Sequence, residues 1–316
     1  MRKQNKIIME RRAKILTKET ATIEEILFPD AIFTADWHLR EDAPECRDPK
    51  EFREAQIRKL LFLIELQSKY SCPIYIAGDV FDYWKPSLEF LSELLDILLL
   101  DMELYTIYGN HDLPQHNIKL AKKCGIHLLS KAKKIKILPG THWLQQEHQT
   151  IQIGGRKVLI QHIMTYQGKK LYPGMKDTPA AGLLRKYPKY DVIVTGHNHQ
   201  AFVEEYEGRI LVNPGSITRQ DITQAEFRPR VYLYSAKSNK VQPIYLPIDK
   251  MAVRKSENTE VKEQRNARIE AFIQKLDSGW DSTINFEENL ERFFAANEIK
   301  TSVRHIIAEA LEEIKK

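Results

Sequence analysis

Residues 73–82 read PIYIAGDVFD, an apolar run that ends in a glycine followed by two carboxylates. The run is short and contains β-branched and aromatic residues, a composition typical of a buried strand. Gly78 stands where the backbone must turn sharply or pass close to another group. The stretch therefore predicts a strand that delivers Asp79 and Asp82 to the edge of a sheet.

Four other segments repeat this arrangement. They are residues 31–35, 104–108, 157–160 and 191–195. Each is followed by groups that bind metal ions, and in two of them a glycine, Gly109 or Gly196, comes directly before the first such group. Because parallel strands bring their carboxyl ends to one edge of a sheet, these groups are expected to converge there.

The groups that follow the five runs suit hydrolysis of a phosphodiester. They are Asp36, His38, Asp79, Asn110, His162, His197 and His199. Such a reaction needs hydroxide near neutral pH and positive charge on the phosphate oxygens, which two divalent ions roughly 3.5–4 Å apart provide. A carboxylate between the ions offsets their repulsion, and imidazole and amide groups complete the shells. Asp79 is placed to be that bridge.

The order Asp-x-His, Gly-Asp-x-x-Asp, Gly-Asn-His-Asp, His, Gly-His-x-His resembles the calcineurin-like metallophosphoesterase superfamily. The resemblance covers roughly residues 30–215 and implies that two ions share Asp79. One set of ligands would be Asp36, His38, Asp79 and His199, and the other Asp79, Asn110, His162 and His197.

The resemblance also implies roles for the neighbouring residues. His111 would be the catalytic acid or the group that stabilises the oxyanion, and Asp112 beside it would orient or charge that imidazole. Asp82 would hold a ligand histidine from behind the metal shell. His116 matches no motif, but it follows closely enough to approach the site.

The expected fold is α/β, the four-layer αββα sandwich of the superfamily, with two mixed sheets flanked by helices. Helices are expected from Asp48-Pro49, where an aspartate cap precedes a proline, and from about Leu88 to Leu100. The segments at 134–137, 150–153, 231–234 and 241–245 favour a more antiparallel sheet. Three regions are predicted: a charged helical segment at 1–27, the catalytic domain at 28–250 and a small helical C-terminal extension at 251–316.

Within the superfamily the chain resembles the DNA repair exonuclease subunits of the SbcD type, in phage and bacteria. Motifs 78–82 and 109–112, the turn at 213–216 and the helical tail carry this likeness. It implies a DNA exonuclease or endonuclease, a coiled-coil ATPase partner or a homodimer, and manganese as the metal, with Zn²⁺, Fe and Mg²⁺ as alternatives. Arg40 stands where the family's first motif usually has glycine.

The surroundings of the motifs favour a polyanionic substrate. Residues 1–250 carry 37 Lys and Arg against 30 Asp and Glu. Lys169 and Lys170, after His162, and Arg219, after the turn at 213–216, are candidate substrate contacts.

Other functions stay open. A phosphodiesterase or pyrophosphatase acting on nucleotides or other small molecules is the main alternative, followed by a protein phosphatase and a metal-free scaffold. No apolar run reaches the ~20 residues needed to cross a bilayer, and no signal-type segment opens the chain, so a cytoplasmic protein without a membrane anchor is expected. Cys46, Cys72 and Cys124 are expected to be reduced thiols.

Overall fold

The computed structural model describes residues 28–98, 103–138, 150–168 and 177–254, together with a few positions between 290 and 304. The predicted segment at 1–27 and nearly all of the predicted extension at 251–316 lie outside the described residues, so these predictions stay open. Among the described residues no helix is both long and apolar enough to cross a membrane.

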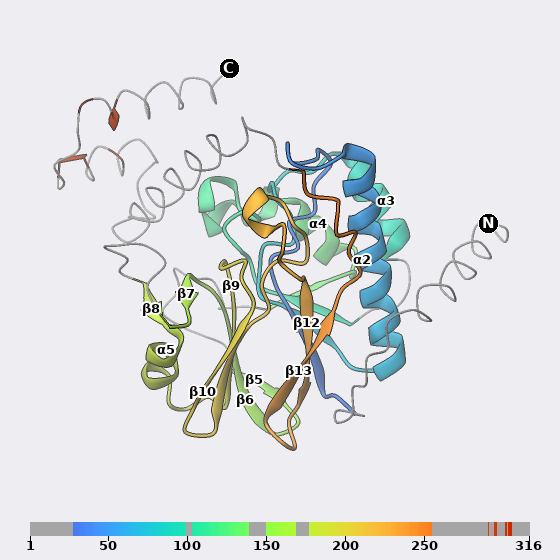
Figure 1. Ribbon diagram of the computed structural model, residues 1–316. Helices are drawn as coiled ribbons and strands as arrows, with labels where there is room; N and C mark the ends of the chain where they lie inside the picture. Colours follow the sequence, from blue (N-terminus) through green and yellow to red (C-terminus); the bar gives the residue numbers. More distant parts are fainter. Residues whose placement is uncertain are drawn as a thin grey trace.

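The described elements form two main sheets and flanking helices (Figure 1). The helices are α2 (Pro49–Tyr70), α3 (Leu88–Ile97), α4 (Gly125–Lys131) and α5 (Ala180–Lys186), with the 3₁₀ turns η1 (Pro114–His116), η2 (Ile118–Lys123) and η3 (Ile222–Gln224). The strands of the first sheet are β1 (Ala31–Thr34), β2 (Ile74–Ile76), β3 (Leu104–Thr106), β4 (Lys136–Ile137), β12 (Arg230–Ser235) and β13 (Lys240–Tyr245). The strands of the second are β5 (Ile151–Ile153), β6 (Arg156–His162), β9 (Val192–Gly196), β10 (Phe202–Tyr206) and β11 (Arg209–Asn213). A small pair, β7 (Thr165–Tyr166) and β8 (Thr178–Pro179), lies apart.

The two sheets are mixed, as the sequence predicts. The first has the order β13-β12-β1-β2-β3-β4, and the second β10-β11-β9-β6-β5. Strands β1 to β4 are parallel to one another, and so are β6, β9 and β11.

The antiparallel pairing expected after Cys124 is only partly correct. Strand β4 pairs with β3 in parallel, and β12 and β13 extend the first sheet beside β1. The sequence predicts antiparallel pairing for all four segments, which is confirmed for β5, β12 and β13 and wrong for β4. The alternating pattern of a half-buried edge strand does not specify the neighbour or its direction, because both kinds of pairing use the same two-residue period.

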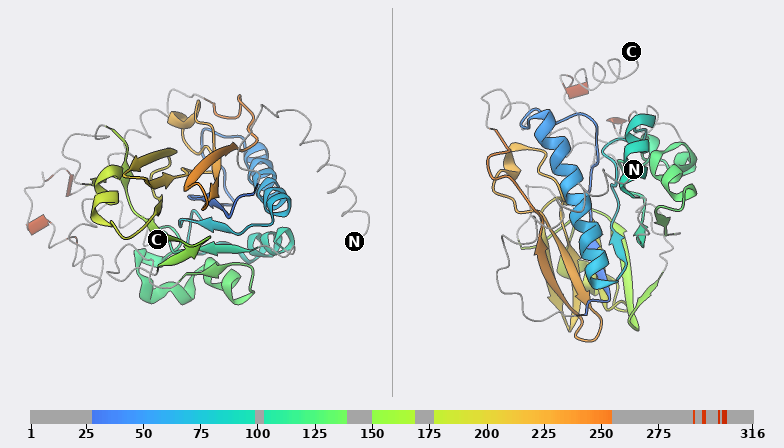
Figure 2. Two further views of the ribbon diagram at one scale, coloured as in Figure 1. Left: turned by 90° about the horizontal axis from the view of Figure 1, so that it is seen from below. Right: turned by 90° about the vertical axis from the view of Figure 1, so that its right-hand side faces the viewer.

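Three apolar clusters hold the layers together. One joins α2, α3 and α4 to the outer face of the first sheet, a second fills the space between the sheets, and a third packs α5 against the second sheet. Figure 1 shows α2 and α3 on one side of the strands and α5 on the other, and the right-hand view of Figure 2 shows α2 lying along the first sheet. The expected four-layer fold is confirmed.

The start of α2 follows the sequence signal. The side chain of Asp48 accepts a hydrogen bond from the backbone of Glu51 at 3.0 Å, and Pro49 occupies the first turn. Helix α3 begins after Ser87, whose hydroxyl accepts from Phe90 at 3.1 Å. Both helices pack along the first sheet after strands that carry site residues.

Replacing Asp48 with alanine should lower the free energy of unfolding by about 1 kcal/mol, because the first turn of α2 loses its side-chain acceptor. Urea denaturation of Asp48→Ala measures this, with the exposed neighbour Lys50→Ala as the control. A loss no larger than that of the control would contradict the role of this cap.

Candidate metal centre

Seven polar side chains meet at the carboxyl ends of β1, β2, β6 and β9 and in the loop after β3. They are the predicted ligands Asp36, His38, Asp79, Asn110, His162, His197 and His199, and all lie in described segments. Three groups of ligand atoms within 4.8 Å of one another can be drawn among them and His111. The structure therefore brings together residues up to 163 positions apart in the sequence, from Asp36 to His199.

Asp79 lies at the centre of this arrangement. One of its carboxylate oxygens, Oδ2, is 3.1 Å from Nε2 of His162 and 3.6 Å from Nε2 of His38. The other, Oδ1, accepts a hydrogen bond from the backbone of His111 at 2.9 Å. Asp79 thus contacts histidines of both predicted ligand sets, as a bridging ligand must.

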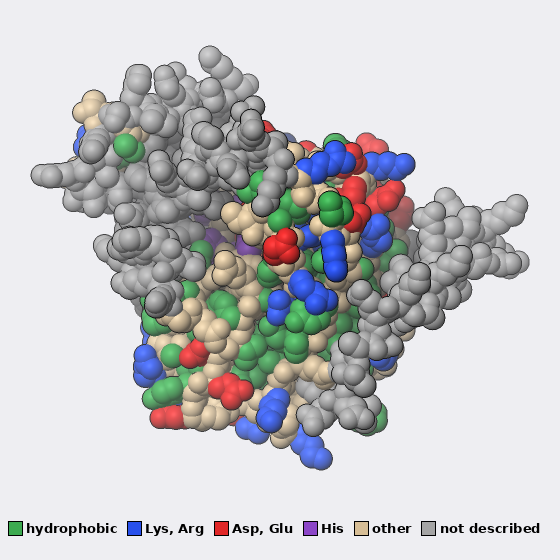
Figure 3. Space-filling view, viewed as in Figure 1, with side chains coloured by type: hydrophobic (Ala, Val, Ile, Leu, Met, Phe, Trp, Pro, Cys, Tyr) green, Lys and Arg blue, Asp and Glu red, His purple; other side chains and the backbone are tan. Residues whose placement is uncertain are grey.

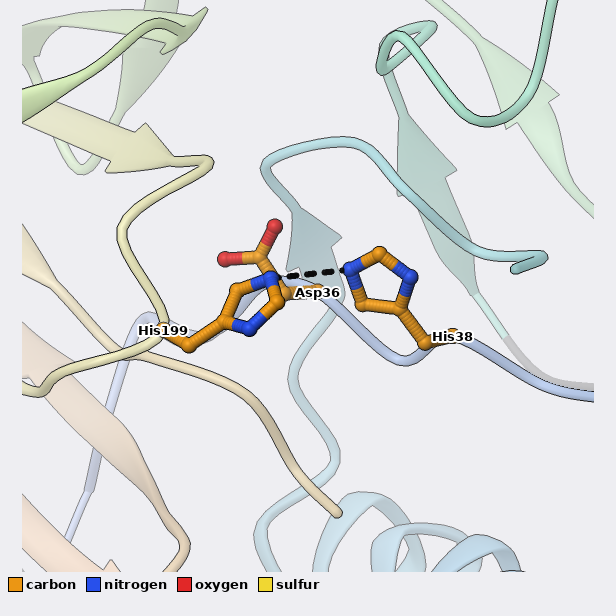
Figure 4. A group of neighbouring side chains, drawn as sticks. All are labelled: Asp36, His38 and His199. Atoms are coloured by element: carbon orange, nitrogen blue, oxygen red, sulfur yellow. Dashed lines mark hydrogen bonds between the residues drawn. The ribbon is translucent and has the colours of Figure 1, made fainter. Parts of the chain in front are cut away.

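On one side of Asp79 stand Asp36, His38 and His199 (Figure 4). The two imidazoles face each other with 3.1 Å between their Nε2 atoms. The carboxylate of Asp36 accepts from the backbone of His197 at 3.0 and 3.1 Å, which fixes its position.

On the other side stand Asn110, His162 and His197. The Oδ1 atom of Asn110 is 2.9 Å from Nε2 of His162 and also 2.9 Å from Nδ1 of His197. The amide oxygen therefore lies between two ring nitrogens, in the position expected of the second ligand set.

In two of these histidines, a hydrogen-bond acceptor outside the centre fixes which ring nitrogen carries the proton. Nδ1 of His162 donates to the carbonyl of Ala77 at 2.7 Å, and Nδ1 of His38 donates to Oδ1 of Asp82 at 3.0 Å. With the proton held at Nδ1, each neutral ring turns the lone pair of Nε2 toward Asp79. Asp82 thus has the position behind a ligand histidine that the sequence predicts for it.

This donor set fits a cation. In the neutral state the lone pair of His162 would face a carboxylate oxygen of Asp79, and that of His38 would face a nitrogen of His199; a cation between these groups would make both contacts favourable. The carboxylate of Asp79 raises the pKa of His162 to about 9, although burial opposes this change. Burial and neighbouring imidazoles lower the pKa of His197 and His199, which keeps those rings neutral, as metal ligands must be.

The backbone at the site is held in an uncommon conformation. Asp36, His38, Asp79 and His197 have φ angles of 48°, 43°, 52° and 80°, in the left-handed region. Non-glycine residues seldom adopt it, and such positions cluster at functional sites. Fixed backbone at four candidate ligands is a sign that the surrounding structure imposes their directions.

Two glycines allow the strand ends to approach. A Cβ atom on Gly109 would lie 2.0 Å from Oδ1 of Asp79, and one on Gly196 would lie 2.2 Å from the carbonyl of Ala77. Neither distance is possible for a real side chain. The position of each glycine directly before a candidate ligand is thus explained by contact with a neighbouring strand end.

The predicted role of Asp112 needs correction. Its carboxylate is fully buried and accepts from the backbone of Val80, Phe81 and Gly109 at 3.3, 3.0 and 3.0 Å. Nδ1 of His111 donates instead to the carbonyl of Asp82 at 2.8 Å. Asp112 therefore joins the loops after β2 and β3, and a backbone carbonyl orients His111.

Arg219 also differs from its predicted role as a substrate contact. Only 2% of the residue is exposed, and its guanidinium donates to the carbonyls of Ala225 and Asp249. Since these bonds anchor the loop that contains η3, we assign Arg219 a structural role. Lys169 and Lys170 lie outside the described residues, so their predicted contacts stay predictions.

The cluster opens into a cavity of about 640 Å³. Asp79, Asn110, His111, His197 and His199 lie on its wall. His116, which the sequence predicts as a surface or loop residue close enough to approach the site, lines the cavity. The lining also includes residues that no sequence motif indicates: Met164, Gln200, Asp221, Thr223, Gln224 and Phe227. The capping box formed by Asp221 and Gln224 around η3 is the one local signal these residues carry, and it indicates a turn and no chemistry.

Arg40 gives the first motif a feature of its own. Its guanidinium contacts Oδ2 of Asp82 at 2.9 Å, while Oδ1 of the same carboxylate holds His38. The backbone of Arg40 is bound in turn by Gln56 of α2 at 2.9 and 3.0 Å. Burial raises the pKa of Asp82, but its hydrogen bond to His38 and the positive charges of His38, Arg40 and His111 outweigh this and lower the pKa to about 2.

Two mixed sheets between helices, with carboxylates, imidazoles and an amide at one edge, define a metallohydrolase of the α/β sandwich class. The model of the family described as "Calcineurin-like phosphoesterase superfamily domain" matches residues 35–235. The chain belongs to this superfamily, and it is a metal-dependent phosphoesterase.

Solved structures that match this chain include an archaeal phosphodiesterase, a predicted phosphoesterase from Streptococcus pneumoniae TIGR4, and Vps29 from Entamoeba histolytica in complex with zinc. They are 16%, 13% and 15% identical to this chain, with TM-scores of 0.40, 0.31 and 0.33. The matches cover 68%, 64% and 70% of this chain, and 99%, 79% and 98% of those chains.

Replacing Gly109 with alanine should abolish metal binding, because the new methyl group would displace the carboxylate of Asp79. Metal content after gel filtration measures this, with Gly182→Ala on α5 as a control distant from the site. Full metal content in Gly109→Ala would contradict the contact between Gly109 and Asp79.

Replacing Asp79 with asparagine should lower bound metal toward zero and abolish activity, since the centre loses its central negative charge. Asp191→Asn, which alters a carboxylate paired with Arg156 before β9, should keep its metal. Two tightly bound ions in Asp79→Asn would show that Asp79 is not the bridge.

Proposed function

We propose that the protein is a two-metal phosphodiesterase that cleaves nucleic acid, with DNA as the first candidate. The observation that supports two ions is the position of Asp79, whose carboxylate lies between the His38 and His162 nitrogens. One ligand set would be Asp36, His38, Asp79 and His199, and the other Asp79, Asn110, His162 and His197. When bound, the two ions would lower the pKa of a water molecule and neutralise charge on the phosphate oxygens.

The chain's own residues would orient the substrate and handle the proton. His111 lines the cavity, and the bond from its Nδ1 to the carbonyl of Asp82 leaves Nε2 for the substrate. Burial lowers its pKa, but the carboxylates of Asp79 and Asp82 outweigh that effect and raise it overall. A raised pKa favours the protonated ring, which can donate to the leaving oxygen or stabilise a charged phosphate oxygen.

The nature of the substrate is supported by charge and size. Residues 1–250 carry an excess of positive charge, which favours a polyanion. The cavity of about 640 Å³ is in the usual range for sites that bind a single small molecule, so it could take one nucleotide unit at a time. The same size also suits the second candidate, a nucleotide phosphodiesterase or pyrophosphatase.

An activity screen separates these candidates. Single-stranded DNA, duplex DNA, RNA, cyclic nucleotides and bis-p-nitrophenyl phosphate would each be tested with Mn²⁺, Zn²⁺ and Mg²⁺. Cleavage of DNA would support the nuclease proposal. Robust nucleotide hydrolysis without cleavage of any nucleic acid would replace it with the second candidate, and no hydrolysis of any phosphodiester would refute both the nuclease and the nucleotide phosphodiesterase.

Replacing His111 with glutamine should keep both ions while turnover falls by about 10²–10⁴, the usual contribution of a positioned acid or base. The backbone bond from residue 111 to Asp79 is retained in this variant, so the metal centre keeps its support. Metal analysis and the rate with bis-p-nitrophenyl phosphate test this together. Loss of metal would make His111 a ligand, and an unchanged rate would remove it from catalysis.

A further inference from the structure

Three side chains at one end of β12 and β13 form a compact cationic and aromatic group. The guanidinium carbons of Arg228 and Arg230 lie 4.3 and 4.8 Å from the centre of the Tyr245 ring. Arg230 and Tyr245 are directly opposite each other across the two strands. Tyr245 is 42% exposed although it is large and aromatic. We call Arg228, Arg230 and Tyr245 the platform.

The platform lies beside the candidate metal centre. Strand β12 runs antiparallel to β1, with Tyr232 opposite Phe33, so the start of β12 is at the end of β1 that leads to Asp36. Phe227, the residue before Arg228, lines the cavity. Figure 3 shows Lys and Arg side chains over the upper ends of β12 and β13, on the same face as the visible histidine, with an acidic side chain between them.

The guanidinium groups of the platform are held without a carboxylate. Within the part of the chain that the structure describes, no ion pair joins Arg228 or Arg230 to an acidic side chain, whereas Arg40, Arg47, Arg53 and Arg156 each have one. Nε of Arg230 donates to the carbonyl of Arg228 at 3.1 Å, which ties the two together. A guanidinium stacked on an aromatic ring keeps its N–H donors at its edge and loses little freedom when it binds an anion.

The depth of the metal centre restricts what can use the platform. Asp36, His38 and Asp79 are at most 1% exposed, so the phosphate to be cleaved must enter the cavity. A rigid duplex cannot place a backbone phosphate there without local separation of its strands, but a single strand can. A mononucleotide would lie wholly inside the cavity and would leave no phosphate for the platform.

We propose that the platform binds a phosphate of single-stranded nucleic acid that flanks the one being cleaved. Arg228 and Arg230 supply the donors, and the ring of Tyr245 fixes their directions. The platform would therefore make the enzyme prefer a strand over a mononucleotide. This proposal rests on the phosphodiesterase function proposed above and names the form of its substrate.

Charge reversal at Arg228, which is exposed, tests the platform without disturbing the core. Arg228→Glu should lower kcat/KM for a single-stranded oligonucleotide at 50 mM salt by about tenfold or more, the effect of losing a charge-assisted bond. Its rate with bis-p-nitrophenyl phosphate should stay within about twofold of the wild type, because that small diester reaches only the cavity. The salt dependence of oligonucleotide binding should also become shallower, by about 0.7 in slope per phosphate lost.

The chain offers a matched control. Arg185, on α5, also lies over a tyrosine, Tyr206, with 5.5 Å between its guanidinium carbon and the ring centre. That pair is at the end of β10 where Tyr206 meets Arg209, opposite to the metal centre. Arg185→Glu changes the net charge equally and should leave both activities unchanged.

Substitutions of Tyr245 separate orientation from charge. Tyr245→Phe keeps the ring and should behave as the wild type, whereas Tyr245→Ala should lose oligonucleotide activity as Arg228→Glu does. Three outcomes would overturn the proposed role of the platform. Oligonucleotide activity could fall equally in Arg185→Glu and Arg228→Glu, or it could be unchanged in Arg228→Glu. The rate of Arg228→Glu with bis-p-nitrophenyl phosphate could also fall as much as its oligonucleotide activity. Duplex DNA cleaved as well as a single strand would overturn the preference, and failure of the wild type on every diester would refute the function beneath it.

Discussion

The structure depends on one electrostatic constraint, the placement of a buried carboxylate, Asp79, among histidine nitrogens. Asp79 is only 1% exposed and touches histidines from two sides. Burying such a charge is costly unless cations or donors compensate it. The centre is therefore arranged for positive charge. Gly109 and Gly196 lie where a side chain would clash with Asp79 and with the carbonyl of Ala77.

The second constraint is direction. A metal ligand must present a particular nitrogen, and here the proton of each assigned ring is held by a group outside the centre. Ala77 holds His162 and Asp82 holds His38. Asn213 acts one step further out, since its amide donates to the carbonyls of Asn198 and Gln200 at 2.6 Å each and so fixes the loop that carries His197 and His199.

After the second sheet, the chain returns to the first sheet beside the site. Ile217 donates from its backbone to the carbonyl of Asp36, and β12 then pairs with β1. The loop with η3 is thereby held over the cavity, anchored by Arg219 and by Arg47, which donates to the carbonyl of Arg219. The loop with η3, which lines the cavity, and the segment that carries Asp36 are thus connected by hydrogen bonds and strand pairing.

The sequence by itself determined the chemistry. Apolar runs that end in Asp, Asn and His predict the strands and the candidate ligands, and Asp48 before Pro49 predicts the start of a helix. These predictions succeed because each depends on residues that are neighbours in the sequence. Only the tertiary structure decided that β4 is parallel, that β12 and β13 join β1, that Asp112 serves backbone donors, that Arg219 is buried, and that Arg228 meets Tyr245. These facts depend on which distant segments lie side by side. A local pattern fixes which face of a strand is buried, but the packing of the whole domain fixes its neighbour.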